Sequence, residues 1–141
     1  MTRSFVDTNI FVYRLDDNEP RKQAIAEALV QDLIASHEIV ISTEILQELF
    51  VTLTRKLSAN LDALDAEEIV RAHVELPVVQ VDVSLILRAM DRIEAASISF
   101  WDALVVEAAL VASATRLLTE DLQHGQVFDG RLRVENPFRP G

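Results

Sequence analysis

The chain has 141 residues, half of them hydrophobic, and it contains no cysteine, which excludes disulfide bonds and zinc sites with thiolate ligands. Its formal net charge of −10 excludes the overall positive field that usually attracts nucleic acids, so such a partner would need a local arrangement of charge. The first residues contain no apolar stretch of signal-peptide length, and the longest apolar run falls short of the ~18 residues of a membrane span. We therefore expect a cytoplasmic protein with one domain at 1–136 and a C-terminal tail at 137–141.

Short runs rich in β-branched residues alternate with longer segments of helical periodicity. The first run is Phe5-Val6, and a short helical turn follows it from Ile10 to Tyr13. Pro20 suits the first turn of a helix that should end near Ser36. Further strands are expected at 39–41, 78–81 and 116–118, with 132–134 as a candidate fifth, and further helices at 42–57, 65–74, around 85–93, and at 99–113.

Two patterns mark the beginnings of these helices. Ser42 can cap the helix that follows the second strand, and the segment 65–68 resembles a capping box. Segment 121–130 is expected to be a loop. The alternation of strands with crossover helices predicts a three-layer α/β/α sandwich around a central, mainly parallel sheet of about five strands.

Acidic residues recur where the apolar segments end. Asp7 follows the first strand, Glu48 lies in the helix after the second, Asp102 lies near the start of the apolar helix, and Asp121 follows the fourth strand. Because open α/β sheets bind ligands at the carboxyl ends of their strands, we expect these four carboxylates to meet in one crevice. Their oxygen ligands favour Mg²⁺, with Mn²⁺ as the alternative ion, and the hydrolysis of a phosphodiester.

Asp7 and Glu48 also have explanations that involve no metal. Asp7 could simply cap the next helix, because an aspartate there accepts hydrogen bonds from unpaired backbone N–H groups. Glu48 has a rival in Glu44, one turn earlier on the same helix. On a helical wheel Glu44 lies opposite the centre of the apolar face, whereas Glu48 is displaced toward Ile45, so Glu48 is the better inward candidate by a small margin.

Asp102 and Asp121 have structural alternatives as well. Ser99 and Asp102 have the spacing of a capping box, but a carboxylate in so apolar a helix needs compensation, and the other three acids favour a metal. Asp121 has Glu120 as a neighbour, and an aspartate in a turn often bonds to local backbone groups. Trp101 could stack on a base, although packing in the core is the simpler expectation in this helix.

Four segments together resemble the signature blocks of PIN-domain ribonucleases, in the same order and with the same spacing. The blocks are Phe5-Val6-Asp7-Thr8-Asn9, Ile45-Leu46-Gln47-Glu48-Leu49, Ser99-Phe100-Trp101-Asp102-Ala103 and Leu118-Thr119-Glu120-Asp121. One block would be weak evidence, but four in register across nearly the whole chain are strong. The compact form resembles the VapC-type toxins of toxin-antitoxin pairs. The resemblance selects Glu48 rather than Glu44 as the acid of the second block.

The resemblance implies a Mg²⁺-dependent endoribonuclease that cuts structured RNA, with transfer or ribosomal RNA as the usual target. It also implies a cognate antitoxin, whose tail places an arginine against the acidic cluster, and a homodimer. The expected catalytic and metal-binding acids are Asp7, Glu48, Asp102 and Asp121, with Asp7 and Asp102 as the leading direct ligands and with Thr8, Asn9 and Thr119 as orienting neighbours.

Functions of other classes are also compatible with parts of the sequence. A haloacid-dehalogenase-like phosphatase would need an aspartate where the chain has Asn9, and a receiver domain would need a late lysine, whereas none follows Lys56. The stronger rival is a catalytically inactive PIN-like module that acts through protein contacts, which the net acidity favours. A basic rim for RNA could be formed by Arg14, Arg21, Lys22, Arg55 and Lys56, although scattered surface charge is the more common arrangement.

Overall fold

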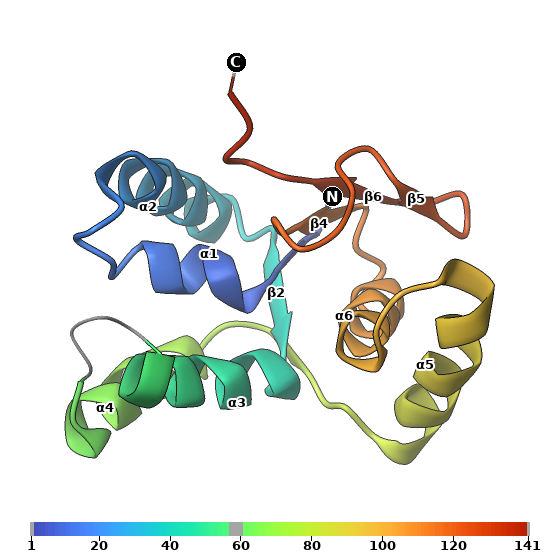
Figure 1. Ribbon diagram of the computed structural model, residues 1–141, viewed down its shortest axis with the longest axis horizontal. Helices are drawn as coiled ribbons and strands as arrows, with labels where there is room; N and C mark the ends of the chain where they lie inside the picture. Colours follow the sequence, from blue (N-terminus) through green and yellow to red (C-terminus); the bar gives the residue numbers. More distant parts are fainter. Residues whose placement is uncertain (1, 57–60, 141) are drawn as a thin grey trace.

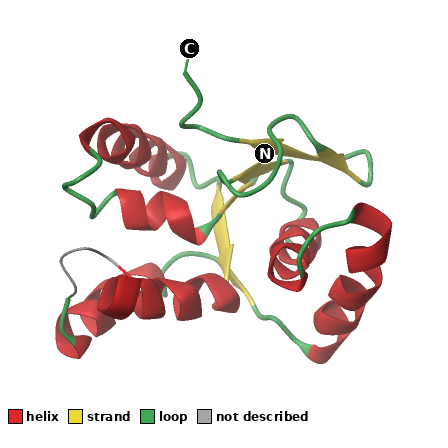
Figure 2. Cartoon of the chain, in the orientation of Figure 1, coloured by secondary structure: helices red, strands yellow, loops and turns green. Residues whose placement is uncertain are grey.

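The computed structural model describes residues 2–56 and 61–140 (Figures 1 and 2). Its strands are β1 (Ser4–Val6), β2 (Ile39–Ser42), β3 (Val78–Val79), β4 (Arg116–Leu118), β5 (Val127–Phe128) and β6 (Leu132–Glu135). Its helices are α1 (Thr8–Tyr13), α2 (Pro20–Ala35), α3 (Thr43–Val51), α4 (Ala63–His73), α5 (Val83–Ala96) and α6 (Phe100–Val111), and a short π-helix, η1 (Thr52–Lys56), continues α3.

The strands form one sheet in the order β3-β2-β1-β4-β6-β5. Neighbouring strands are parallel except β5 and β6, which pair antiparallel. The register of β1 and β4 aligns Val6 with Leu118, so the residues that follow them, Asp7 and Thr119, leave the sheet side by side. The carboxyl ends of β1, β2 and β4 therefore share one edge of the sheet, as the sequence predicts.

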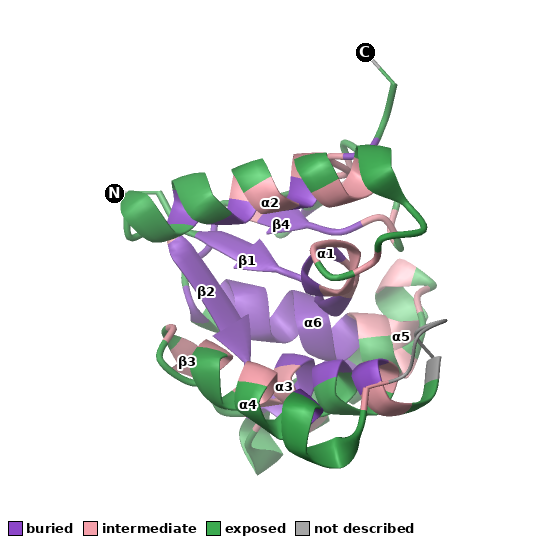
Figure 3. Ribbon diagram, turned by 90° about the vertical axis from the view of Figure 1, so that its left-hand side faces the viewer, coloured by how far each residue is buried: buried purple, intermediate pink, exposed green. Residues whose placement is uncertain are grey.

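Helices cover both faces of the sheet and confirm the expected three-layer sandwich. In Figure 1, α1 to α4 lie to one side of the sheet and α5 and α6 to the other. Helix α6 is buried without interruption from Ala103 to Leu110, because it packs against β2 and against α5. Figure 3 shows this helix and the central strands as one continuous buried layer. The site described below is built on the edge of this rigid core.

The sheet has six strands rather than about five, because β5 lies within 121–130, the segment expected to be a loop. Strand β5 is two residues long and turns into β6 through Asp129 and Gly130, which both adopt positive φ angles, of 53° and 68°. Two residues are too few to show the alternation of apolar and polar side chains by which a strand is recognised. The hairpin makes β5 the edge strand of the sheet, next to β6.

Two of the expected helix starts need correction. Helix α4 is capped by Asp62, whose carboxylate accepts a hydrogen bond from the Asp65 N–H at 2.9 Å, so the box placed at 65–68 begins three residues too late. Ser42 does occupy the N-cap position of α3, but its hydroxyl makes no capping bond. The expected end of that helix near Leu57 lies outside the described residues.

The C-terminal segment returns to the body of the domain. Phe138 is buried, its ring meets the Tyr13 ring edge-on at 4.9 Å between centroids, and its carbonyl accepts a hydrogen bond from Arg21 at 2.9 Å. Within residues 2–56 and 61–140, no helix has both the length and the hydropathy that a bilayer crossing requires.

Candidate active site

Asp7 lies directly after β1 at the N-cap of α1, which holds its carboxylate at the carboxyl edge of the sheet. One oxygen accepts a hydrogen bond from the Thr8 N–H at 2.8 Å, and the other accepts one from the Thr119 hydroxyl at 2.7 Å. Burial raises the pKa of Asp7 from 3.8 to about 7, although both hydrogen bonds favour the charged form. Asp7 therefore caps α1, as the structural explanation predicts. Capping alone does not explain why this carboxylate is buried beside other acidic residues.

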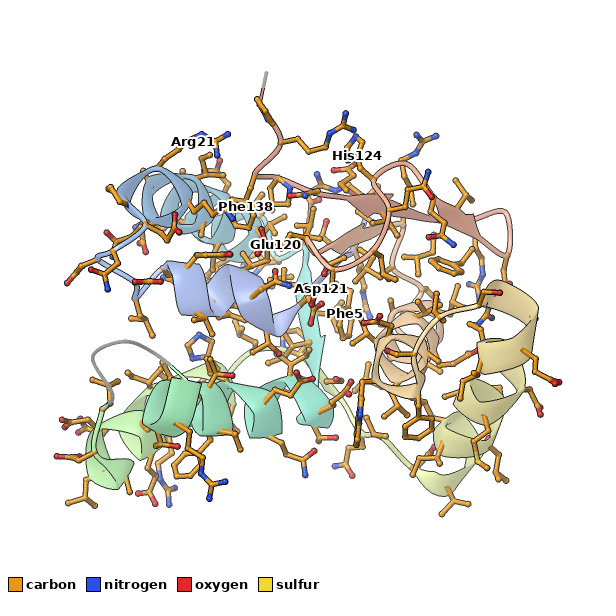
Figure 4. The ribbon with its side chains drawn as sticks, in the orientation of Figure 1. Phe5, Arg21, Glu120, Asp121, His124 and Phe138 are labelled. Carbon is orange, nitrogen blue, oxygen red and sulfur yellow. The ribbon has the colours of Figure 1, made fainter. Side chains whose placement is uncertain are left out.

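Thr119 connects Asp7 to the turn that follows β4. Its buried hydroxyl donates to Asp7 and accepts a hydrogen bond from the Asp121 N–H at 3.1 Å. The side-chain amide of Asn9 donates to the Asp121 carboxylate at 3.1 Å and to the Thr119 hydroxyl at 3.4 Å. These bonds tie the ends of β1 and β4 together, and Figure 4 shows Asp121 beside the start of α1.

Glu120, the neighbour that rivals Asp121 in the sequence, has other partners. Its carboxylate accepts a hydrogen bond from the Tyr13 hydroxyl and forms an ion pair with Lys22 at 3.0 Å. In Figure 4 it lies between Phe138 and Asp121, on the side of Asp121 that faces Phe138. The geometry therefore favours Asp121 as the acid that this turn contributes to the site.

Asp102 approaches the same space from the first turn of α6. Ser99 caps the helix by accepting a hydrogen bond from the Asp102 N–H at 3.0 Å, so the cap uses the backbone of Asp102. Burial raises the pKa of Asp102 above its usual value; the hydrogen bond with Ser99 opposes this shift, and the negative charge of Asp121 adds to it. The helix cap and the acidic site are thus compatible at this position.

Trp101, expected in the core, is 65% exposed, and its ring contacts Phe100 edge-on at 5.3 Å between centroids. Continuous burial of α6 begins only at Ala103, although its apolar sequence begins earlier. The apolar pattern alone does not show where the cover of neighbouring elements ends. An indole next to Asp102 is consequently accessible at the surface.

Helix α3 brings two glutamates toward the site. The helical wheel predicts that Glu48 is the more inward of the two, and the structure shows the opposite order of burial. Glu44 is 4% exposed, whereas Glu48, one turn later, is an exposed residue. Burial raises the pKa of Glu44 from 4.5 to about 8, and the negative charges of Glu48, Asp7 and Asp102 act in the same direction, in that order. The wheel fails because it contains only α3 itself, whereas α1, α4 and β2 also pack against this helix.

The structure brings the four predicted acids into one electrostatic cluster and adds Glu44. Asp7 is influenced by Asp121 and Glu48, and Asp102 by Asp121. In the described part of the chain, no three histidine or acidic side chains already stand close enough to bind one ion together. Carboxylates that repel one another would have to close around a cation, so its binding should be coupled to proton release.

Buried oxygens without a hydrogen-bond partner gather at the same edge. Among residues 2–56 and 61–140 they are Thr8 Oγ1, Asn9 Oδ1, Ser42 Oγ and both carboxyl oxygens of Glu44. Each belongs to the end of β1 or β2 or to the first turn of the next helix. Unsatisfied buried oxygens are costly, and oxygen donors of this kind suit Mg²⁺ or Mn²⁺. The residues present therefore fit a hard divalent cation.

The expected basic rim is largely engaged within the fold. Arg14 pairs with Glu27 at 3.0 Å, and Lys22 and Arg21 have the partners given above. Arg55 is exposed, and the side chain of Lys56 lies outside the described residues. The cations assigned to the rim from the sequence thus mostly stabilise α1 and α2 and their neighbours.

A three-layer sandwich with acidic side chains at the carboxyl edge of a mainly parallel sheet defines a Rossmann-like domain. The chain belongs to the PIN domain family, whose sequence profile matches residues 4–127. All five clustered acids lie within the matched segment.

Solved structures with the same fold include toxins. A toxin-antitoxin complex from Klebsiella pneumoniae has a TM-score of 0.66 at 16% identity and covers 97% of this chain and 99% of its own. DNA-bound VapBC from Salmonella typhimurium has the same values. VapC20 of Mycobacterium tuberculosis, described as a sarcin-ricin loop cleaving toxin, has a TM-score of 0.63 at 21% identity over 81% of this chain and 86% of its own. No curated protein sequence matches the chain significantly.

Proposed function

We propose that the protein is a Mg²⁺-dependent endoribonuclease and the toxin of a toxin-antitoxin pair. The observation that carries the proposal is the convergence of Asp7, Asp102 and Asp121, with Glu48 nearby, at the carboxyl edge of a PIN domain. Ribosomal RNA, cut by one structural neighbour, and transfer RNA are the proposed substrate classes.

In this mechanism Asp7 and Asp102 would hold the cation directly, while Glu48 and Asp121 would complete the set or act through bound water. Thr119 and Asn9 hold Asp7 and Asp121 in position through the hydrogen bonds described above. When bound, the cation polarises the scissile phosphate and lowers the pKa of an attacking water. Because burial raises the pKa of Asp7 to about 7, any proton that this carboxyl carries would have to leave before it could hold a cation.

Recognition of RNA has to overcome the net charge of −10. Part of this charge belongs to the cluster, where a divalent cation neutralises it locally. The exposed indole of Trp101 next to Asp102 offers a flat surface for a base, and stacking does not depend on net charge. Because hydrolysis by water does not use the ribose 2′-hydroxyl, the preference for RNA would arise in binding.

We further propose a cognate antitoxin and a homodimer. Two structural neighbours are complexes of such pairs. A groove of about 570 Å³ between α3 and α4, lined mainly by Leu46, Phe50, Val51 and Val70, supports a protein partner with apolar side chains. A smaller hollow beside it includes Glu48, against which a cationic side chain of that partner would be stabilised.

Cleavage of RNA by the purified full chain tests the proposed activity. We expect cutting of total RNA and of ribosomes or transfer RNA with Mg²⁺, and none with EDTA. Asp7→Ala should abolish it, whereas Glu94→Ala, an exposed acid on α5, should not. Cutting that survives EDTA, or that Asp7→Ala leaves intact, would contradict the mechanism.

The alternative is a catalytically inactive PIN-like module, which the acidity of the chain favours. Such a module predicts no cleavage under any metal condition and no change in thermal stability on addition of Mg²⁺. A metal-induced rise in thermal stability would separate the two functions even before the natural RNA is found.

A further inference from the structure

We propose that Glu44 is a fifth carboxylate ligand of the cation centre, which it completes together with Glu48 from α3. This inference rests on the proposed metal-dependent function and adds a residue that none of the four sequence blocks contains. It concerns which side chains bind the ion and how many ions the centre holds.

Two buried glutamates of the fold differ in their partners. Glu44 is 4% exposed and Glu107 is 5% exposed. Glu107 accepts a hydrogen bond from Arg92 at 2.7 Å and lies 3.7 Å from Arg88. No N–H or hydroxyl group of the described residues donates to either carboxyl oxygen of Glu44. Within residues 2–56 and 61–140, the ion pairs place arginines beside the Glu107 carboxylate and no cation beside that of Glu44.

Glu44 lies at the same edge of the sheet as Asp7. It is the second residue of α3, directly after β2, whose parallel register with β1 brings Ser42 level with Asp7. Among the described residues, the charged groups that act on Glu44 are Glu48, Asp7 and Asp102, all of them acidic, and Glu48 also acts on it through a side-chain hydrogen bond. A buried carboxylate whose charged neighbours are carboxylates would be stabilised by a cation placed among them.

With Glu44 included, the cluster contains five carboxylates. Five ionised carboxylates carry more negative charge than one divalent cation neutralises. Phosphodiester-cleaving sites often hold two ions roughly 4 Å apart, which stabilise the attacking and the leaving oxygens. In the strand order β2-β1-β4, the glutamates of α3 follow the strand on one side of β1 and Asp121 follows the strand on the other, so the five acids extend over three neighbouring strand ends.

Counting bound Mn²⁺ tests the inference without any substrate. The full chain is titrated with Mn²⁺ near neutral pH, and the free ion is measured by electron paramagnetic resonance. The variants are Glu44→Gln, which keeps the shape of the side chain, and Glu94→Gln as an exposed control on α5. Urea unfolding in EDTA is measured in parallel, with Glu107→Gln as the control matched in burial.

We expect Glu44→Gln to lose one of two bound ions or to weaken binding by roughly tenfold or more, while Glu94→Gln matches the wild type. Without metal, Glu44→Gln should raise the urea midpoint and Glu107→Gln should lower it. Wild-type stoichiometry and affinity in Glu44→Gln would overturn the role of Glu44 and leave the nuclease proposal standing. A wild-type chain that binds no Mn²⁺ would overturn both.

Discussion

Replacing Asp7 with asparagine tests whether a buried, uncompensated carboxylate is present at the site. In the metal-free fold the pKa of Asp7 is about 7, against an ordinary value of 3.8. Since one pKa unit corresponds to ~1.4 kcal/mol, ionised Asp7 should lower the free energy of unfolding by about 4 kcal/mol at pH 8. Asparagine is neutral at every pH and escapes this penalty.

The pH dependence has a definite sign. Near pH 5 the folded carboxyl is protonated while the unfolded one is mostly ionised, so the penalty falls to about 2 kcal/mol. The folded state binds more protons than the unfolded state in this range, and wild-type stability should therefore fall as the pH rises toward 7 and level off above it. Asp7→Asn also weakens the hydrogen bond with Thr119, which costs about 1 kcal/mol.

The variant should therefore be about 3 kcal/mol more stable than the wild type at pH 8, and within about 1 kcal/mol of it at pH 5. Urea unfolding followed by circular dichroism in EDTA measures both differences. Asp91→Asn, an exposed acid on α5, should follow the wild type at both pH values. The reasoning is refuted if Asp7→Asn shows the same pH dependence as the wild type.

Three further predictions concern other parts of the molecule. Mg²⁺ should raise the wild-type melting temperature by several degrees, and Asp102→Asn should abolish the rise; an unchanged rise would remove Asp102 from the site. Arg92→Ala should lower the free energy of unfolding by about 3 kcal/mol in a urea titration, because it leaves Glu107 buried without its closest cation. A loss below about 1 kcal/mol would show that Arg88 alone compensates the charge of Glu107. Trp101→Ala should change the free energy of unfolding by less than about 1 kcal/mol, since the indole is exposed. It should raise KM for RNA about tenfold because stacking is lost, and an unchanged KM would exclude that contact.

The sequence predicts much of the fold because its signals are local. Each main strand is a short apolar run, and Pro20 and Ser99 mark helix starts that the structure confirms. Asp7 and Asp121 could be placed at one edge because parallel strands end together. Strand β5 was not predictable, because two residues carry no periodic pattern.

The rest of the site depends on contacts between segments distant in sequence. Glu44 is buried by neighbours from other elements, which a helical wheel of α3 does not include. Trp101 is exposed because the cover of α6 begins two residues later. The one local signal that could have identified Glu44 is its place two residues after a strand that ends at the same edge as β1.

Anomalous diffraction from crystals soaked in Mn²⁺ tests the central claim most directly, since it locates the ion without assuming any activity. The account predicts a peak within about 2.5 Å of carboxylate oxygens of both Asp7 and Asp102, with Asp121 and the α3 glutamates around it. Crystals that show no peak there, or a peak only at acids outside this cluster, would contradict it.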